Sequence, residues 1–139
     1  MQRLKVRDIM SSDLVTLKED DDLGLAENVM RFGRIRHLPV VKNGKLVGLV
    51  THRDILSAQV SSLADLSVED INELKLSIPA SEIMKKDVET VSPEDPVLKA
   101  ARILKRNKYG CLPVVNDRKL IGIITEADFI DLVIRALEN

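Results

Sequence analysis

The sequence contains one unit twice. Residues 6–56 align with residues 80–130 at a constant offset of 74 residues and without a gap. A register held over 51 positions indicates a duplication, and each copy must then form the same elements. The identical residues of the first copy, each recurring 74 residues later, are Ile9, Met10, Asp13, Thr16, Asp21, Ala26, Leu38, Pro39, Val40, Val41, Lys45, Leu46, Gly48, Thr51 and Asp54.

Each copy predicts the element order β-α-β-β-α. An extended segment (14–17 or 88–91) precedes a helix whose apolar residues share one face. A β-branched strand (38–41 or 112–115), a tight turn and a return strand (46–51 or 120–125) follow, and Asn43-Gly44 is a strong turn signal. A closing helix begins at residue 52 or 126. The predicted helix faces are Leu23, Ala26, Val29 and Met30 in one copy and Val97, Ala100, Ile103 and Leu104 in the other.

The helix of the second copy carries a start signal of its own. Ser92-Pro93-Glu94-Asp95 has the pattern of a capping sequence with proline at the first helical position. We therefore expect that helix to begin at Pro93.

These elements predict an α+β fold of two pseudo-symmetric repeats packed sheet to sheet with the helices outside. One copy alone is too small to cover both faces of its sheet. We expect repeat 1 over residues 1–58, a helical connector over 59–79 and repeat 2 over 80–139. A helix within the connector should begin at Ser67 and end before Pro79.

Composition and charge argue against several classes of function. The 21 basic and 22 acidic residues give a net charge of −1, which disfavours binding to nucleic acid. The absence of a long apolar run disfavours a signal peptide and membrane insertion, and with a single cysteine it favours the cytoplasm. His37 and His52 lack metal-ligand neighbours, and Cys111 is expected to fill an apolar position. No nucleophile–base pair stands out, so an enzyme is not expected.

The repeated segments resemble the CBS domain family, and their duplication resembles the tandem pair called a Bateman module. The elements that match are Arg7-Asp8-Ile9-Met10, the Leu-Pro-Val-Val strands and the Gly-x-x-Thr-x-x-Asp segments 48–54 and 122–128. Residues 66–74 of the connector are similar to those of acetoin-utilisation AcuB-like chains.

The resemblance implies two clefts between the repeats, each able to take an adenosine-containing ligand. AMP, ADP, ATP and S-adenosylmethionine are the expected ligands, and no cofactor is required. Thr51 and Thr125 would stand where a helix N-terminus attracts a phosphate or ribose oxygen. Asp54 and Asp128 would accept the ribose hydroxyls.

Further residues are expected around such a ligand. The glycine of each segment suits a close approach of the backbone to a ligand. Apolar walls around the base would come from the segments Met10 to Thr16 and Met84 to Thr90, beside Pro39 and Pro113 of the neighbouring strands.

A simpler interpretation competes with binding. Thr-x-x-Asp is also a capping box, in which the threonine caps the helix and the acid bonds back to the threonine N–H. Such a cap stabilises a helix by about 1 kcal/mol and needs no ligand. The CBS context favours binding, and the capping alternative stays open.

The two copies differ where phosphates would lie. The first has Arg34, Arg36, His37 and Arg53, and the second has Lys108, Gly110, Cys111 and Ala127 at the same positions. We expect Arg36, His37 and Arg53 to supply most phosphate contacts. The alternative is that Arg34, Arg36 and Arg53 are solvated surface charges. A ligand with a neutral end, or no ligand, would suit the second copy.

The C-terminal helix indicates a partner. Phe129, Leu132, Val133, Ala136 and Leu137 form one apolar stripe, and Ile130 and Ile134 lie outside it. We expect a homodimer, with burial by the connector or by the chain's own core as the alternative. The predicted function is a regulatory sensor that acts on a partner protein in trans; a ligand-independent interaction or dimerisation module is the alternative.

Overall fold

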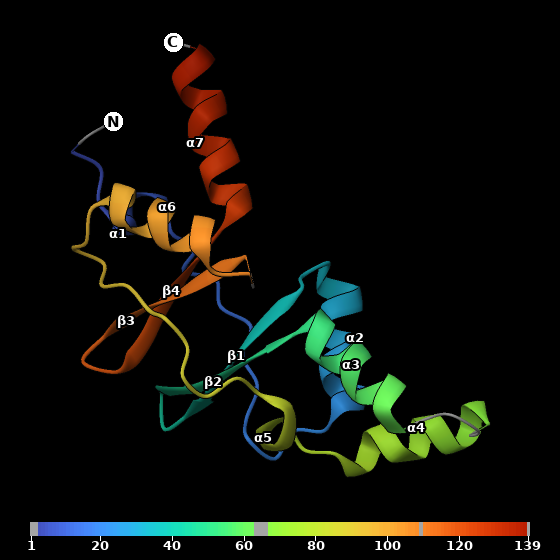
Figure 1. The fold of residues 1–139 in the computed structure, drawn as a ribbon. Helices are drawn as coiled ribbons and strands as arrows, with labels where there is room; N and C mark the ends of the chain where they lie inside the picture. The colour runs from blue at the N-terminus through green and yellow to red at the C-terminus, as the bar shows by residue number, and fades with distance from the viewer. Residues whose placement is uncertain (1–2, 63–66, 109, 139) are drawn as a thin grey trace. The chain divides into compact units, whose positions relative to one another are not determined.

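The computed structural model describes residues 3–62, 67–108 and 110–138 (Figure 1). Its mixture of helices and antiparallel hairpins confirms the α+β class. No helix in these three ranges is long and apolar enough to cross a membrane. In chain order the elements are α1 (Val6–Ile9), α2 (Leu23–Gly33), β1 (His37–Lys42), β2 (Lys45–Thr51), α3 (His52–Ser62), α4 (Val68–Ser77), α5 (Ala80–Ile83), α6 (Val97–Arg106), β3 (Cys111–Asn116), β4 (Lys119–Thr125) and α7 (Glu126–Glu138).

Two compact units make up the chain, and their limits differ from those of the sequence repeats. We call Val15–Val88 the middle unit, and Met1–Leu14 together with Glu89–Asn139 the terminal unit. The division falls inside both repeats, just after Leu14 and just after Val88. The predicted repeat and connector boundaries describe the duplicated sequence and stay a prediction.

The middle unit is built on the β1–β2 hairpin. Its strands pair in register from His37 with Thr51 to Lys42 with Lys45. The turn takes positive φ at Asn43 (53°) and Gly44 (78°), as the Asn-Gly pair predicts. The predicted strand before α2 is reduced to one parallel bridge, from Leu17 to Val40. The buried core of this unit is Leu17, Ala26, Met30, Leu38, Val40, Val50, Ile55 and Ala80.

The terminal unit repeats this arrangement on the β3–β4 hairpin. Its turn also has two positive φ angles, at Asp117 (50°) and Arg118 (70°), although neither residue is glycine. The predicted strand before α6 is likewise reduced to one parallel bridge, from Val91 to Val114. The predicted face of α6 is confirmed, because all four residues of that face are buried. The buried core of this unit is Val6, Ile9, Val91, Val97, Ala100, Ile103, Leu104, Leu112, Val114 and Ile124.

The short helix that opens each repeat packs in the unit built on the other repeat's hairpin. In the terminal unit the N–H of Val6 donates to the carbonyl of Asp95 (2.8 Å). In the middle unit the N–H of Ala80 donates to the carbonyl of Asp21 (2.7 Å). Val6 and Ala80 are equivalent positions, as are Asp95 and Asp21, so the two exchanges have the same geometry.

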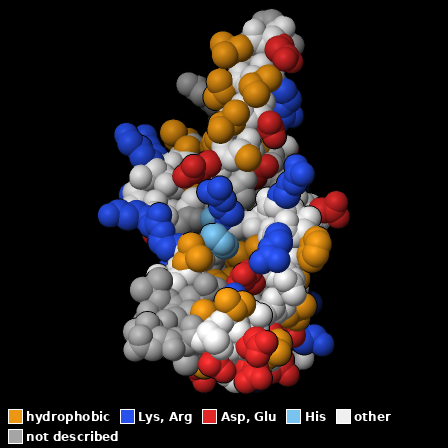
Figure 2. Space-filling model, turned by 90° about the vertical axis from the view of Figure 1, so that its right-hand side faces the viewer, with side chains coloured by type: hydrophobic (Ala, Val, Ile, Leu, Met, Phe, Trp, Pro, Cys, Tyr) orange, Lys and Arg blue, Asp and Glu red, His pale blue; other side chains and the backbone are white. Residues whose placement is uncertain are grey.

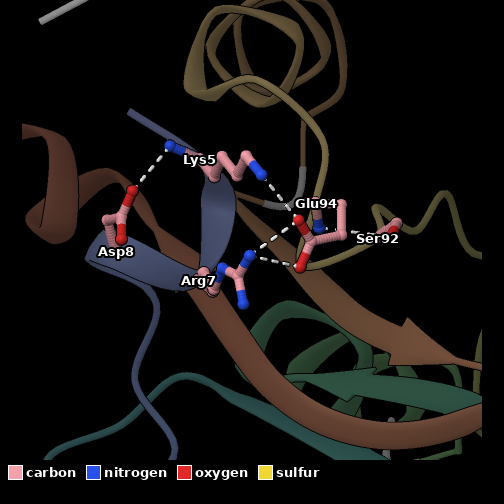
Figure 3. Close-up of polar contacts among 5 residues, drawn as sticks. All are labelled: Lys5, Arg7, Asp8, Ser92 and Glu94. Carbon is pink, nitrogen blue, oxygen red and sulfur yellow. Dashed lines mark hydrogen bonds and ion pairs between the residues drawn. The ribbon is translucent and has the colours of Figure 1, made fainter. Parts of the chain in front are cut away.

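Side chains reinforce the docking of α1. Glu94 accepts from Lys5 (2.8 Å) and Arg7 (2.7 Å), as Figure 3 shows. The hydrogen bond from Lys5 and the charge of Arg7 lower the pKa of Glu94. All three side chains are about half exposed, so these pairs orient α1 more than they stabilise it.

The predicted helix start at Pro93 is wrong. Helix α6 begins at Val97, after Pro96 as its N-cap. Ser92 to Asp95 instead forms a turn, in which the Asp95 carboxylate accepts the N–H of Ser92 (2.9 Å). The carbonyls of Pro93 and Asp95 then accept N–H groups of α1, so this stretch serves the docking of α1 instead of starting a helix.

The remaining helix predictions hold. Helices α3 and α7 begin directly after the return strands, at His52 and Glu126. The connector helix α4 begins after Ser67, whose hydroxyl accepts the N–H of Asp70 (3.1 Å), and it ends before Pro79.

Candidate nucleotide-binding site

Thr51 and Asp54 form a complete capping box at the start of α3. The Thr51 N–H donates to Oδ2 of Asp54 (2.9 Å), and the Asp54 N–H donates to Oγ1 of Thr51 (3.2 Å). Thr51 is buried and Asp54 is partly buried. The capping interpretation is therefore correct for this copy as far as the helix is concerned, and it occupies one of the two carboxylate oxygens.

Lys85 holds the second oxygen of Asp54. Its Nζ lies 2.8 Å from Oδ1. The backbone of Lys85 is fixed beside β2, because its N–H and C=O both bond to Leu49 (2.8 and 3.0 Å). Neither the repeat nor the motif predicts a role for Lys85, although the difference in charge from Ser11 at the same position of the other copy was an available signal.

Thr125 and Asp128 make the equivalent contact at the start of α7 with a different hydrogen-bond pattern. The Thr125 N–H donates to Oδ2 of Asp128 (2.8 Å), and the Thr125 hydroxyl lies 3.4 Å from the same oxygen. Within the described residues no cation pairs with Asp128. Burial raises the pKa of Asp128, and the nearby charge of Asp131 adds to that effect. One carboxylate oxygen at this site is thus without a protein partner in the described part of the chain.

Gly48 and Gly122 allow a close approach of another segment of the chain. This corrects the expectation that they allow a close approach of the backbone to a ligand. A Cβ on Gly48 would lie 2.8 Å from Cγ of Met84 and 3.0 Å from the carbonyl oxygen of Lys85. At Gly122 it would lie 3.1 Å from both Cγ of Met10 and the Ser11 carbonyl oxygen. Glycine is needed here because the segment from the other repeat crosses the strand directly over the Cα.

The same crossing divides the two predicted apolar walls. Met10 lies in the terminal unit and Thr16 in the middle unit, since the division falls after Leu14. Met84 lies in the middle unit and Thr90 in the terminal unit for the same reason. Each unit thus combines the methionine of one repeat with the threonine and the Thr-x-x-Asp segment of the other.

The strands place the remaining predicted residues near these segments. In the middle unit the Leu17 N–H donates to the Pro39 carbonyl (2.9 Å), which sets Thr16 beside Pro39. In the terminal unit the Val91 N–H donates to the Pro113 carbonyl (3.1 Å), which sets Thr90 beside Pro113. Pro39 and Pro113 are buried in their strands.

Three predicted basic residues lie together in the middle unit. His37 pairs with Thr51 across the hairpin, and the Arg36 carbonyl accepts the N–H of His52 (2.9 Å). Arg36 and Arg53 are exposed, and neither forms an ion pair among the residues described. Their side chains are therefore available to an anion.

The terminal unit has no such group at the equivalent positions. Cys111 pairs with Thr125, is completely buried, and burial raises the pKa of its thiol to about 12. This confirms the expected apolar role of Cys111. Tyr109 lies outside the described residues.

Comparison with known proteins decides the family. The CBS domain model matches residues 6–61 and 80–135, which is most of the chain. The chain belongs to the CBS domain family. A CBS domain-containing protein of Dictyostelium discoideum is 35% identical over 98% of this chain and 95% of its own length. The chain also matches the homoserine O-acetyltransferase of Methanohalobium evestigatum with 37% identity, but it spans only 24% of that protein.

Solved structures agree with the repeat architecture of this CBS pair. A putative acetoin utilization protein (AcuB) from Vibrio cholerae has 38% identity and a TM-score of 0.83, over 97% of this chain and 93% of that one. The CBS pair of protein MJ0100, solved with 5′-methylthioadenosine and S-adenosyl-L-methionine, has 28% identity and a TM-score of 0.80 over 96% and 98%. CBSX2 in complex with AMP has 25% identity and a TM-score of 0.80 over the same shares.

Proposed function

We propose that this CBS pair is a non-catalytic regulatory module that binds an adenosine-containing ligand through its Thr-x-x-Asp segments. The observation that carries the proposal is the state of the two carboxylates. In each copy the threonine N–H donates to one oxygen of the aspartate. The other oxygen of Asp54 pairs with Lys85, which a ligand could displace. The other oxygen of Asp128 has no partner among the described residues. Fixed carboxylates of this kind suit the paired hydroxyls of a ribose.

The relatives with bound ligands support the ligand class. Their structures contain AMP, 5′-methylthioadenosine and S-adenosyl-L-methionine, which share an adenosine and differ at its 5′ end. We infer AMP, ADP, ATP or S-adenosylmethionine as the class for this chain, in agreement with the ribose contacts proposed for Asp54 and Asp128.

The charges of the two units suit different 5′ groups. Arg36, His37 and Arg53 stand near Thr51 and favour a phosphate at that segment. Near Thr125 the equivalent positions lack cations, and Asp131 adds negative charge beside Asp128. A phosphate would be repelled there, so a neutral or positively charged 5′ group suits the Thr125–Asp128 segment.

The ligand would act by shifting an equilibrium between two arrangements of the chain or its assembly. It can shift that equilibrium only by its difference in affinity for the two arrangements. The output is a change in the binding of a regulated protein in trans.

A second function, a ligand-independent dimerisation module, is favoured by the exposed face of α7. Figure 2 shows hydrophobic side chains gathered along this helix. Phe129 and Leu132 pack on the core of the terminal unit, which corrects the single stripe expected from the sequence. The large apolar side chains left exposed on α7, spaced as one helical stripe, are Ile130, Val133, Ile134 and Leu137. A homodimer through this stripe accompanies either function.

Thermal unfolding with AMP, ADP, ATP and S-adenosylmethionine separates the two functions. A ligand at 100 times its Kd stabilises the folded state by about 2.7 kcal/mol. We expect a rise in Tm with at least one of them, and a smaller rise in D54N or D128N. No rise with any ligand, together with a dimer that Leu137→Lys breaks and the exposed-site control Leu76→Lys does not, supports the interaction module instead.

A further inference from the structure

We propose that Lys85 makes the Asp54 site selective for adenosine ligands that carry a phosphate. The inference rests on the proposed function and adds a selectivity device to it. Lys85 is not one of the residues that are identical between the repeats, and it lies outside the Gly-x-x-Thr-x-x-Asp motif. It is nevertheless the direct partner of the carboxylate on which the ribose would bind.

Lys85 and a bound ribose would compete for one oxygen of Asp54. Oδ2 of Asp54 is held by the Thr51 N–H (2.9 Å), and Oδ1 is held by Lys85 Nζ (2.8 Å). A ribose that donates one hydroxyl to each oxygen of Asp54 would compete with Lys85 Nζ for the lone pairs of Oδ1. A neutral ligand weakens the Lys85–Asp54 ion pair and supplies no charge in its place, so its binding is opposed by the weakening of that pair.

The ammonium group of Lys85 can move away from Asp54 while the main chain of Lys85 stays in place. The N–H and the C=O of Lys85 both form hydrogen bonds with the backbone of Leu49, so the residue stays beside β2. Its side chain is 39% exposed, whereas that of Asp54 is 14% exposed, so the lysine is the partner with room to move. A ligand phosphate supplies the replacement anion, and Lys85 then exchanges the carboxylate for the phosphate.

The other copy provides an internal comparison. Ser11 occupies the position of Lys85 and makes the same two backbone hydrogen bonds, to Ile123 (2.9 and 3.0 Å). Its short neutral side chain cannot neutralise Asp128. The two segments thus share their backbone geometry and differ in one charge, which predicts that the Asp128 site accepts neutral adenosine ligands without this cost.

The experiment titrates the full chain with AMP and with adenosine, two probes that differ only in the phosphate. Amide NMR shifts of Thr51 and Asp54 report one site, and those of Thr125 and Asp128 report the other. In the unmodified chain we expect AMP to bind the Asp54 site more tightly than adenosine. Lys85→Met, which keeps the apolar stem, should tighten adenosine and weaken AMP at that site, lowering the preference for AMP about fivefold or more.

Two variants serve as controls. Lys86→Met removes the same charge from the adjacent exposed residue and should leave the preference for AMP nearly unchanged. Ser11→Lys should transfer a preference for AMP to the Asp128 site. Unchanged amide shifts of the buried core residues Leu38 and Val40 in the ligand-free Lys85→Met protein show that the variant is folded.

Three results would overturn the inference. The first is equal loss of AMP and adenosine affinity in Lys85→Met, which would make Lys85 a general binding residue. The second is a response confined to Thr125 and Asp128 in both proteins, which leaves the proposed function standing. The third is no shift at either site with either probe, which overturns the proposed function as well.

Discussion

Ser11 and Ile123 exchange two backbone hydrogen bonds, from Ser11 N to Ile123 O (2.9 Å) and from Ile123 N to Ser11 O (3.0 Å). Lys85 and Leu49 do the same in the middle unit. The opening segment of each repeat therefore completes the unit of the other repeat. Because the opening segments are exchanged between the repeats, each unit contains residues of both repeats. The exchange also determines which residues surround each Thr-x-x-Asp segment.

Ile9→Ala is expected to destabilise the terminal unit, although Ile9 belongs to the first sequence repeat. Ile9 is buried in the core that contains Leu112 and Ile124, and truncating a buried isoleucine costs about 2–5 kcal/mol. Hydrogen exchange should show faster exchange in β3 and β4 than in β1 and β2. The matched variant Ile83→Ala should have the opposite distribution, because Ile83 packs on the core of the middle unit. Faster exchange of β1 and β2 in Ile9→Ala would contradict the exchange of segments.

Gly48→Ala is expected to lower the free energy of unfolding by about 1–3 kcal/mol. The added methyl group would enter the space of the Met84 side chain and would press on the Lys85 carbonyl, and such overpacking is destabilising. Urea denaturation measures the change. Gly33→Ala is the control, since its new Cβ would meet only Ile35 at an ordinary 3.5 Å. Equal stability of the two variants would show that the crossing segment is not held tightly.

The two threonine caps should differ in strength. Thr51→Ala removes an acceptor for the Asp54 N–H and should cost about 1 kcal/mol. Thr125→Ala should cost less, because the Thr125 hydroxyl faces the Asp128 carboxylate and no bond from the Asp128 N–H to it is present among the described contacts. Chemical denaturation of both variants under one set of conditions gives the comparison, and a larger loss in Thr125→Ala would contradict the hydrogen-bond assignment.

As the pH is lowered, ligand binding at Asp128 should begin to weaken at a higher pH than it would for an aspartate with an ordinary pKa. Burial raises the pKa of Asp128, so protonation begins at higher pH than usual. A protonated carboxyl loses acceptor capacity for the ribose, and affinity therefore falls as pH decreases through the raised pKa. Calorimetric titration with 5′-methylthioadenosine between pH 7 and pH 4 measures the effect. D128N should show weaker binding with little dependence on pH, and an unchanged pH profile in D128N would assign the titration to another group.

The sequence could predict the parts of this fold that local chemistry determines. The Asn43-Gly44 turn requires positive φ, and the beginnings of α3 and α7 follow from the Thr-x-x-Asp pattern, so these predictions are correct. The exchange of α1 and α5 could not be predicted. Both copies carry the same methionine and the same glycine, so pairing within a repeat and pairing between repeats satisfy one pattern equally well.

The residues of the candidate site that belong to the repeated motif could be predicted, and those that depend on the exchanged segment could not. Thr51, Asp54, Thr125 and Asp128 come from the motif, and the structure brings each threonine to its aspartate. Lys85 was missed because its contact with Asp54 joins residues 31 apart and depends on the exchanged segment. The helix start predicted at Pro93 was wrong because the turn that bonds to α1 contains the same residue types as a helix N-terminus.

The most direct test of ribose binding compares AMP with 2′-deoxy-AMP by calorimetry on the unmodified chain, D54N and D128N. A hydroxyl bonded to a carboxylate contributes about 1.5–3 kcal/mol, so we predict that the deoxy ligand binds at least tenfold more weakly. In the asparagine variant of the occupied site this difference should shrink. Equal affinity for the two ligands in the unmodified chain would contradict the account, because the aspartates would then serve only as helix caps.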